Sequence, residues 1–101
     1  MAEIEVAKVT DLASGQGKVV EANGKEIGLF NINGTFHAID NTCPHMGGPL
    51  GEGECSDSVV ACPWHGWQFD VKTGVSPVNP AAKITTYPVR VDGGKVFVHL
   101  E

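Results

Sequence analysis

Two short segments, Cys43-Pro44-His45 and Cys62-Pro63-Trp64-His65, each place a cysteine close to a histidine. Both lie among glycines and prolines, which regular helices and strands tolerate poorly, so each segment is predicted to be a loop. Cysteine thiolate and histidine imidazole are ligands of zinc, copper and iron–sulfur centres. The two loops must face each other to form a four-ligand site, and this requirement constrains the fold more than any other feature of the chain.

The order of these residues bears on what the site holds. Zinc fingers usually pair cysteine with cysteine and histidine with histidine, whereas the order here is Cys, His, Cys, His. Gly47, Gly48 and Gly66 leave backbone N–H groups free to approach sulfur atoms closely. An iron–sulfur centre is therefore favoured, and a Cys2His2 zinc ion in a small interaction module is the alternative.

The rest of the sequence is typical of short antiparallel strands. Asn23-Gly24 and Asn33-Gly34 lie between runs of branched and aromatic residues and predict type I′ hairpin turns. Further strands are expected over 4–9, 58–61 and 68–71, and in a closing hairpin over 84–91 and 96–100. Loops are expected over 41–53, 62–67 and 76–80, and single helical turns over 7–13 and 80–83. The predicted class is all-β, with one domain over residues 1–101.

Composition excludes several classes of function. The chain of 101 residues has 7 basic and 12 acidic side chains, so the basic patch of a nucleic-acid-binding protein is not expected. Residues 41–70 contain four acidic residues and no lysine or arginine. No stretch approaches the roughly 20 apolar residues of a membrane span. The start of the chain lacks the pattern of a secretory signal, so we expect a cytoplasmic protein with no membrane partner.

The residues C-P-H-M-G-G (43–48) and C-P-W-H-G-W-Q-F-D (62–70) together resemble the two cluster-binding loops of a Rieske protein. The resemblance covers nearly the whole chain. It implies the Rieske fold, with short antiparallel sheets and both loops at one tip, and one [2Fe–2S] cluster per chain. It also implies that Cys43 and Cys62 bind the inner iron, and that His45 and His65 bind the outer iron near the surface.

Within this family, the chain is more similar to the ferredoxins of bacterial ring-hydroxylating oxygenases than to respiratory Rieske proteins. The respiratory proteins have a disulfide between the positions of Gly48 and Trp64, and hydroxyl donors at those of Trp67 and Phe69. Hydrogen bonds to sulfur stabilise the reduced cluster. Because the hydroxyls are missing, we expect the reduction potential of the cluster to lie at the low end of the Rieske range, at about −150 mV.

The resemblance thus implies a one-electron carrier and not an enzyme in itself. It would take electrons from a flavin-dependent NAD(P)H reductase and pass them to a terminal oxygenase, docking transiently at the tip formed by His45 and His65. The alternative is the small subunit of an NAD(P)H-dependent nitrite reductase, which has a similar fold. A catalytic oxygenase subunit is not expected, because 101 residues cannot also hold a domain for mononuclear iron.

Other residues are given structural interpretations. Cys55 fits neither loop and is expected to be a free thiol, and His37 and His99 are expected to be ordinary strand residues. Trp64 and Trp67 are expected to shield the cluster or to meet a partner. Asp70 is expected to have a structural role, as a turn residue or by hydrogen bonds that hold the second loop. The acidic segment 52–57 is expected to be a solvated face.

Overall fold

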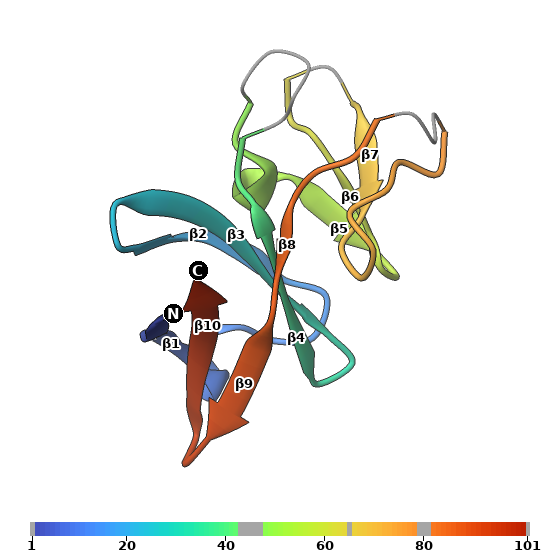
Figure 1. Ribbon diagram of the computed structural model, residues 1–101. Coiled ribbons are helices and arrows are strands. Elements are labelled where there is room, and N and C mark those ends of the chain that lie inside the picture. Colours follow the sequence, from blue (N-terminus) through green and yellow to red (C-terminus); the bar gives the residue numbers. More distant parts are fainter. Residues whose placement is uncertain (1, 43–47, 65, 79–81, 101) are drawn as a thin grey trace.

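The computed structural model describes residues 2–42, 48–64, 66–78 and 82–100 (Figure 1). Nearly all of its regular structure is antiparallel strand, as the sequence predicts. Three sheets have the strand orders β1-β10-β9, β2-β3-β4-β8 and β5-β6-β7. The strands are β1 (Ala2–Lys8), β2 (Gly17–Ala22), β3 (Lys25–Ile32), β4 (Thr35–Asp40), β5 (Glu54–Ser56), β6 (Val59–Ala61), β7 (Gln68–Asp70), β8 (Thr86–Tyr87), β9 (Val89–Asp92) and β10 (Lys95–Leu100).

The four-stranded sheet lies between two apolar cores, because its strands bury both faces. Along β3, Ile27 and Leu29 pack into the first core, whereas Phe30 and Ile32 pack into the second. This division follows from the alternation of side chains along a strand. The first core is shared with β1 and β10, and the second with the β5-β6-β7 sheet. The second core contains Cys62, so it is the one that supports the expected site.

Both Asn-Gly turns have the predicted geometry. Asn23 and Gly24 have φ angles of 54° and 82°, and Asn33 and Gly34 have φ angles of 52° and 89°. Positive φ at both central residues is what a type I′ turn requires. The turns fix the register of the β2-β3 and β3-β4 hairpins, which carry the chain toward the first cysteine.

The predicted strand over residues 84–91 is wrong. It is interrupted at Pro88, and the two halves pair in different sheets: β8 with β4, and β9 with β10. Proline has no N–H to donate to a ladder, so the strand breaks there. The Pro88 carbonyl still accepts a hydrogen bond from the His99 N–H at 2.9 Å. The break lets the chain leave the β2-β3-β4-β8 sheet after β8 and enter the β1-β10-β9 sheet at β9.

The expected helical turns are partly corrected. Within residues 7–13, only Val9–Asp11 forms a short 3-10 helix (η1), because the residues before it belong to β1. Within the expected turn at 80–83, Lys83 is instead extended and forms a bridge with Val75, and residues 80 and 81 lie outside the described residues. The expected loop over 41–53 contains a further 3-10 helix, Leu50–Glu52 (η2). Among the described residues, none of the helices has the length and apolar character needed to cross a membrane.

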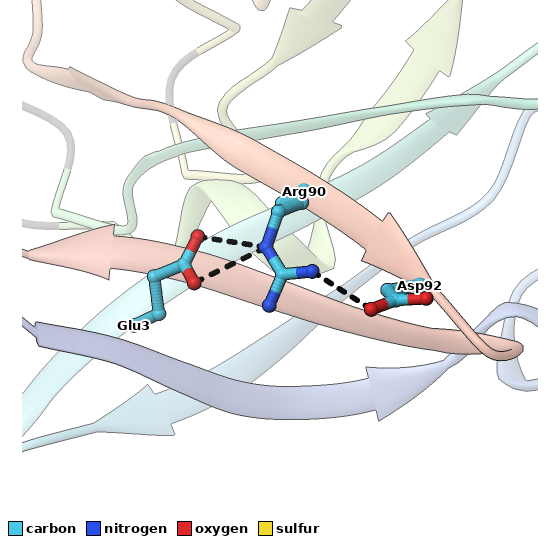
Figure 2. Close-up of polar contacts among 3 residues, drawn as sticks. All are labelled: Glu3, Arg90 and Asp92. Atoms are coloured by element: carbon cyan, nitrogen blue, oxygen red, sulfur yellow. Dashed lines mark hydrogen bonds and ion pairs between the residues drawn. The ribbon is translucent and has the colours of Figure 1, made fainter.

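A surface ion pair spans the sheet formed by β1, β10 and β9. Figure 2 shows Arg90 on β9 donating to Glu3 on β1 and to Asp92, each at 3.0 Å. The same guanidinium lies over the ring of Phe97 on β10, 4.7 Å from its centre. The hydrogen bond from Arg90 lowers the pKa of Glu3. Because all these charges are exposed, solvent screens them, and the ion pairs add little to the stability of the fold.

Candidate metal centre

Cys62 directly follows β6 and is buried, with 3% of its surface exposed. It packs in the second core with Leu50, Val60 and Phe69. Its N–H donates to the Trp67 carbonyl at 2.6 Å, and its carbonyl accepts from the Gly66 N–H at 2.9 Å. These two bonds close the second loop at its base and fix the backbone from which the Cys62 side chain extends.

The first loop reaches the sulfur of Cys62 through Gly48. A Cβ atom on Gly48 would lie 2.6 Å from Cys62 Sγ and 3.1 Å from Trp64 Cγ. The first distance is far below van der Waals contact and the second is tighter than an ordinary contact, so a side chain at position 48 would displace Cys62 or Trp64. The two loops therefore meet at Cys62, as a site built from both of them requires. Trp64, which lies beside this contact, is 56% exposed.

Asn41 anchors the first loop, although sequence reasoning did not select it. Its Oδ1 atom accepts from the Gly51 N–H at 2.7 Å, and its carbonyl accepts from the Leu50 N–H at 2.8 Å. Thr42 and Pro49 form a bridge next to these bonds, which draws both ends of the loop together. Asn41 is 3% exposed. An asparagine directly before a segment rich in glycine and proline was the available sequence signal.

Asp70 has the structural role expected of it. Its Oδ1 atom accepts from the Lys72 N–H at 2.8 Å, and its carbonyl accepts from the Gly74 N–H at 2.7 Å. The N–H of Asp70 donates to the Val75 carbonyl at 2.9 Å. Asp70 thus fixes the turn through which the chain passes from the second loop to the third.

The described part of the third loop (76–78) lies against the second loop (62–67). A hollow of about 140 Å³ between them is lined by Gly66, Trp67, Gln68, Ser76 and Val78. Trp67 also packs against the second core, whereas Val78 is 75% exposed. This end of the molecule therefore presents apolar surface next to the loops.

Cys55, His37 and His99 lie on strands. Cys55 lies in β5, a strand that the sequence did not predict, and is a free cysteine that packs against the edge of the second core. Burial raises the pKa of its thiol, so it stays protonated at neutral pH and is a poor nucleophile. His37 and His99 lie on β4 and β10, as expected. Cys43, His45 and His65 lie outside the described residues.

The described residues fit a cluster that bridges the two loops. Cys62 offers a soft sulfur ligand in an apolar environment, directly where the second loop meets the first. The backbone approaches this sulfur without any intervening side chain, because position 48 is glycine. Both features suit a sulfur-ligated cluster that lies between the loops.

Comparison with known families decides the identity. The family model of the Rieske [2Fe–2S] domain matches residues 2–88. The chain belongs to the Rieske family. The resemblance carried by the two loops is thereby confirmed, and so is the Rieske-type [2Fe–2S] cluster as the cofactor. The zinc alternative is set aside with it.

Relatives place this Rieske protein among the ferredoxins. It is 35% identical over 99 residues to the ferredoxin component of the naphthalene 1,2-dioxygenase/salicylate 5-hydroxylase systems of Ralstonia sp., covering 97% of this chain and 95% of the relative. The ferredoxin of carbazole 1,9a-dioxygenase from Nocardioides aromaticivorans IC177 superposes with a TM-score of 0.90 and 27% identity, over 100% of both chains. This Rieske protein is thus an electron-transfer component and not itself a catalytic enzyme.

Two further structures bear on partners. The ferredoxin in a complex of reduced oxygenase and oxidized ferredoxin in carbazole 1,9a-dioxygenase matches with a TM-score of 0.88 and 28% identity, over 98% of this chain and 97% of that one. A putative nitrite reductase NADPH small subunit matches with a TM-score of 0.86 but 23% identity, over 99% and 100% of the two chains. The latter shows a shared fold only, so the nitrite reductase alternative has less support than the ferredoxin.

Proposed function

We propose that this Rieske ferredoxin takes single electrons from a flavin-dependent NAD(P)H reductase and passes them to a terminal oxygenase in the cytoplasm, as one domain over residues 1–101. The observation that carries the proposal is the position of Cys62. Its sulfur is buried, yet it lies against Gly48, which is also in contact with the half-exposed Trp64. A cluster held there is protected from bulk water but lies close to the molecular surface.

We assign Cys43 and Cys62 to one iron, and His45 and His65 to the other. When bound, the cluster accepts and releases one electron. The chain supplies the two thiolates and two neutral imidazoles that make the oxidised cluster uncharged. The described residues near Cys62 add no hydroxyl at positions 67 and 69, which are Trp67 and Phe69. This supports a potential near the low end of the Rieske range, about −150 mV.

An oxygenase partner is supported by the ferredoxin relatives and by the structure of a related ferredoxin in complex with its oxygenase. We propose that docking occurs at the tip formed by His45 and His65. Val78 and Trp64 are exposed apolar residues at this end of the molecule. A small apolar contact favours brief binding, which repeated turnover requires.

The ligand assignment is tested by electron paramagnetic resonance after reduction with dithionite. We expect a rhombic spectrum with a mean g value below that of [2Fe–2S] ferredoxins with four cysteine ligands, because histidine ligation changes the ligand field. In the His65→Cys variant, the added thiolate charge should lower the potential or prevent cluster binding. A variant with the parent's spectrum and potential would remove His65 from the ligand set.

The electron-transfer role needs an assay with both partners. NADH, a flavin-dependent reductase of a ring-hydroxylating system and its terminal oxygenase are mixed with and without this protein, and product formation is measured. We expect turnover to depend on the ferredoxin. If the protein is reduced by the reductase but supports no oxygenase tested, while a sirohaem nitrite reductase subunit accepts its electrons, the oxygenase role is wrong.

A further inference from the structure

Trp64 and Gly48 come from different loops and meet over a cluster ligand. The missing side chain at Gly48 leaves the space that the indole occupies, since a Cβ there would lie 3.1 and 3.2 Å from two ring carbons of Trp64. The same atom would lie 2.6 Å from Cys62 Sγ. The indole, the glycine and the sulfur are therefore packed together at one point.

Core packing does not explain why a tryptophan stands at this position. The side chain of Trp64 is 56% exposed, and Trp64 is not a member of either apolar core. A tryptophan exposed to this extent gains much less from burial than one in a core. Trp64 instead lies against the other loop, at Gly48.

Where the second core does not cover the sulfur of Cys62, other residues must shield it from water. Cys62 shares the second core with Leu50, Val60 and Phe69, and its backbone is fixed by the bonds to Trp67 and Gly66. Although Trp64 is half-exposed, Cys62 itself is only 3% exposed. Gly48 lies against the sulfur of Cys62, and the indole of Trp64 lies against Gly48 at the same point.

We propose that Trp64 is a positioning residue that clamps the two loops together at Gly48 and keeps water away from the Cys62 sulfur. The inference rests on the Rieske cluster at Cys62 and is independent of the redox partners. Two properties of the loaded protein follow from it. The clamp slows loss of the cluster, and the exclusion of water donors from sulfur keeps the potential low.

The test compares the loaded parent with Trp64→Ala and Trp64→Phe. Loss of the cluster's visible absorption is followed at fixed temperature with a chelator, and the potential is measured by redox titration. Trp64→Ala should lose its cluster faster by a factor of roughly 5 to 30, which corresponds to one lost packing contact. Its potential should rise, because water can then donate hydrogen bonds to the sulfur. Trp64→Phe keeps a ring at the contact, so its rate of cluster loss and its potential should lie between those of the parent and of Trp64→Ala.

Val91→Ala is the matched control. Val91 is also a large apolar residue, 49% exposed, but it lies on β9, away from the β5-β6-β7 sheet (Figure 1). Its substitution should change the loss rate by less than about twofold. If Trp64→Ala folds but cannot retain the cluster at all, that is the extreme of the expected result, and Trp64→Phe then gives the measurable rate.

Two results would overturn the proposal. If Trp64→Ala had the parent's rate of cluster loss and the parent's potential, the indole would neither hold the loops together nor keep water from the Cys62 sulfur. A faster loss with an unchanged potential would make Trp64 a packing residue without control over water at the sulfur. Neither result depends on a reductase or an oxygenase, so failure of the electron-transfer role would be seen separately.

Discussion

Asn41 and Gly48 are not among the proposed cluster ligands, yet their contacts fix the path of the first loop. Asn41 joins the two ends of the loop through its side-chain oxygen, and Gly48 allows the loop to touch Cys62. At this scale the candidate ligands could be proposed from the sequence, because cysteine and histidine are recognisable by type, and their assignment stays a prediction. The supporting contacts could not be predicted, because they depend on distances between residues far apart along the chain.

We expect His37 to make the stability of the fold depend on pH. It lies on β4, and within the described part of the chain its buried Nε2 atom has no hydrogen-bond partner. Burial, with a smaller effect from Lys72, lowers its pKa below the ordinary 6.5, and Asp70 opposes the change. The unfolded chain therefore binds the proton more readily than the folded one. The free energy of unfolding therefore keeps its full value above the pKa that His37 has in the unfolded chain. It falls as the pH drops through the lower pKa that His37 has in the folded chain.

The measurement is the urea midpoint of the parent and of His37→Gln, at about pH 7.5 and about pH 5.5, on either side of the ordinary histidine pKa. The midpoint of the parent should fall more between the two conditions than that of the variant, which cannot titrate. Equal falls would mean that His37 does not contribute to the acid sensitivity.

Phe69 offers a direct test of how donors tune the cluster. It is fully buried and shares the second core with Cys62. Phe69→Tyr should raise the potential, because a hydroxyl that donates to the cysteinyl sulfur stabilises the reduced cluster. Without a partner, the buried hydroxyl would instead lower stability by about 1–3 kcal/mol. Redox titration and urea unfolding of the same variant separate these cases, and an unchanged potential would count against contact with the sulfur.

At the scale of elements, local patterns predict turns better than pairing. The two Asn-Gly hairpins were predictable, because the required φ angles belong to the turn residues themselves. The β5 strand was missed, because Glu54-Cys55-Ser56 has no alternating apolar pattern and is held by its pairing with β6. The break at Pro88 has a local signal, but the exchange of sheets that follows it depends on partners elsewhere in the fold.

Gly74 and Gly93 provide a matched pair of turns. Both have positive φ angles, 79° and 60°, but a Cβ at Gly74 would lie 2.3 Å from the Ile84 carbonyl oxygen, whereas nothing lies within 4 Å at Gly93. Gly93→Ala should cost about 1–2 kcal/mol from backbone strain alone. Gly74→Ala should cost more, about 3 kcal/mol or above, because the backbone at Ile84 must also move. Chemical denaturation measures both, and equal costs would mean that the contact relaxes freely.

At the scale of the whole molecule, the two cores have different sources of stability. The first core is enclosed by long strands, with β1 and β10 paired from Ala2–Leu100 to Lys8–Lys95. The second is enclosed partly by β5, β6 and β7, which have three residues each. Such short strands are marginal without additional support. We infer that the cluster supplies this support by joining the loops above the second core.

Removing the cluster should therefore loosen one part of the fold before the other. In hydrogen exchange on the cluster-free protein, the amides of β5, β6 and β7 should lose protection, while those of β1, β3 and β10 keep it. The loaded protein, measured under the same conditions, is the control. Uniform loss of protection would mean that the two cores unfold as one cooperative unit.

The pairing of β1 with β10 has a practical consequence. Ala2 and Leu100 are partners in the ladder, so the two chain ends emerge side by side and apart from the β5-β6-β7 sheet (Figure 1). Ends that lie close together tolerate joining by a short linker, and new ends can be opened at an exposed turn such as Gly93–Gly94. An affinity tag on either end could also fix the protein to an electrode with its loops facing the solution. Voltammetry could then be recorded without obstructing the side that exchanges electrons.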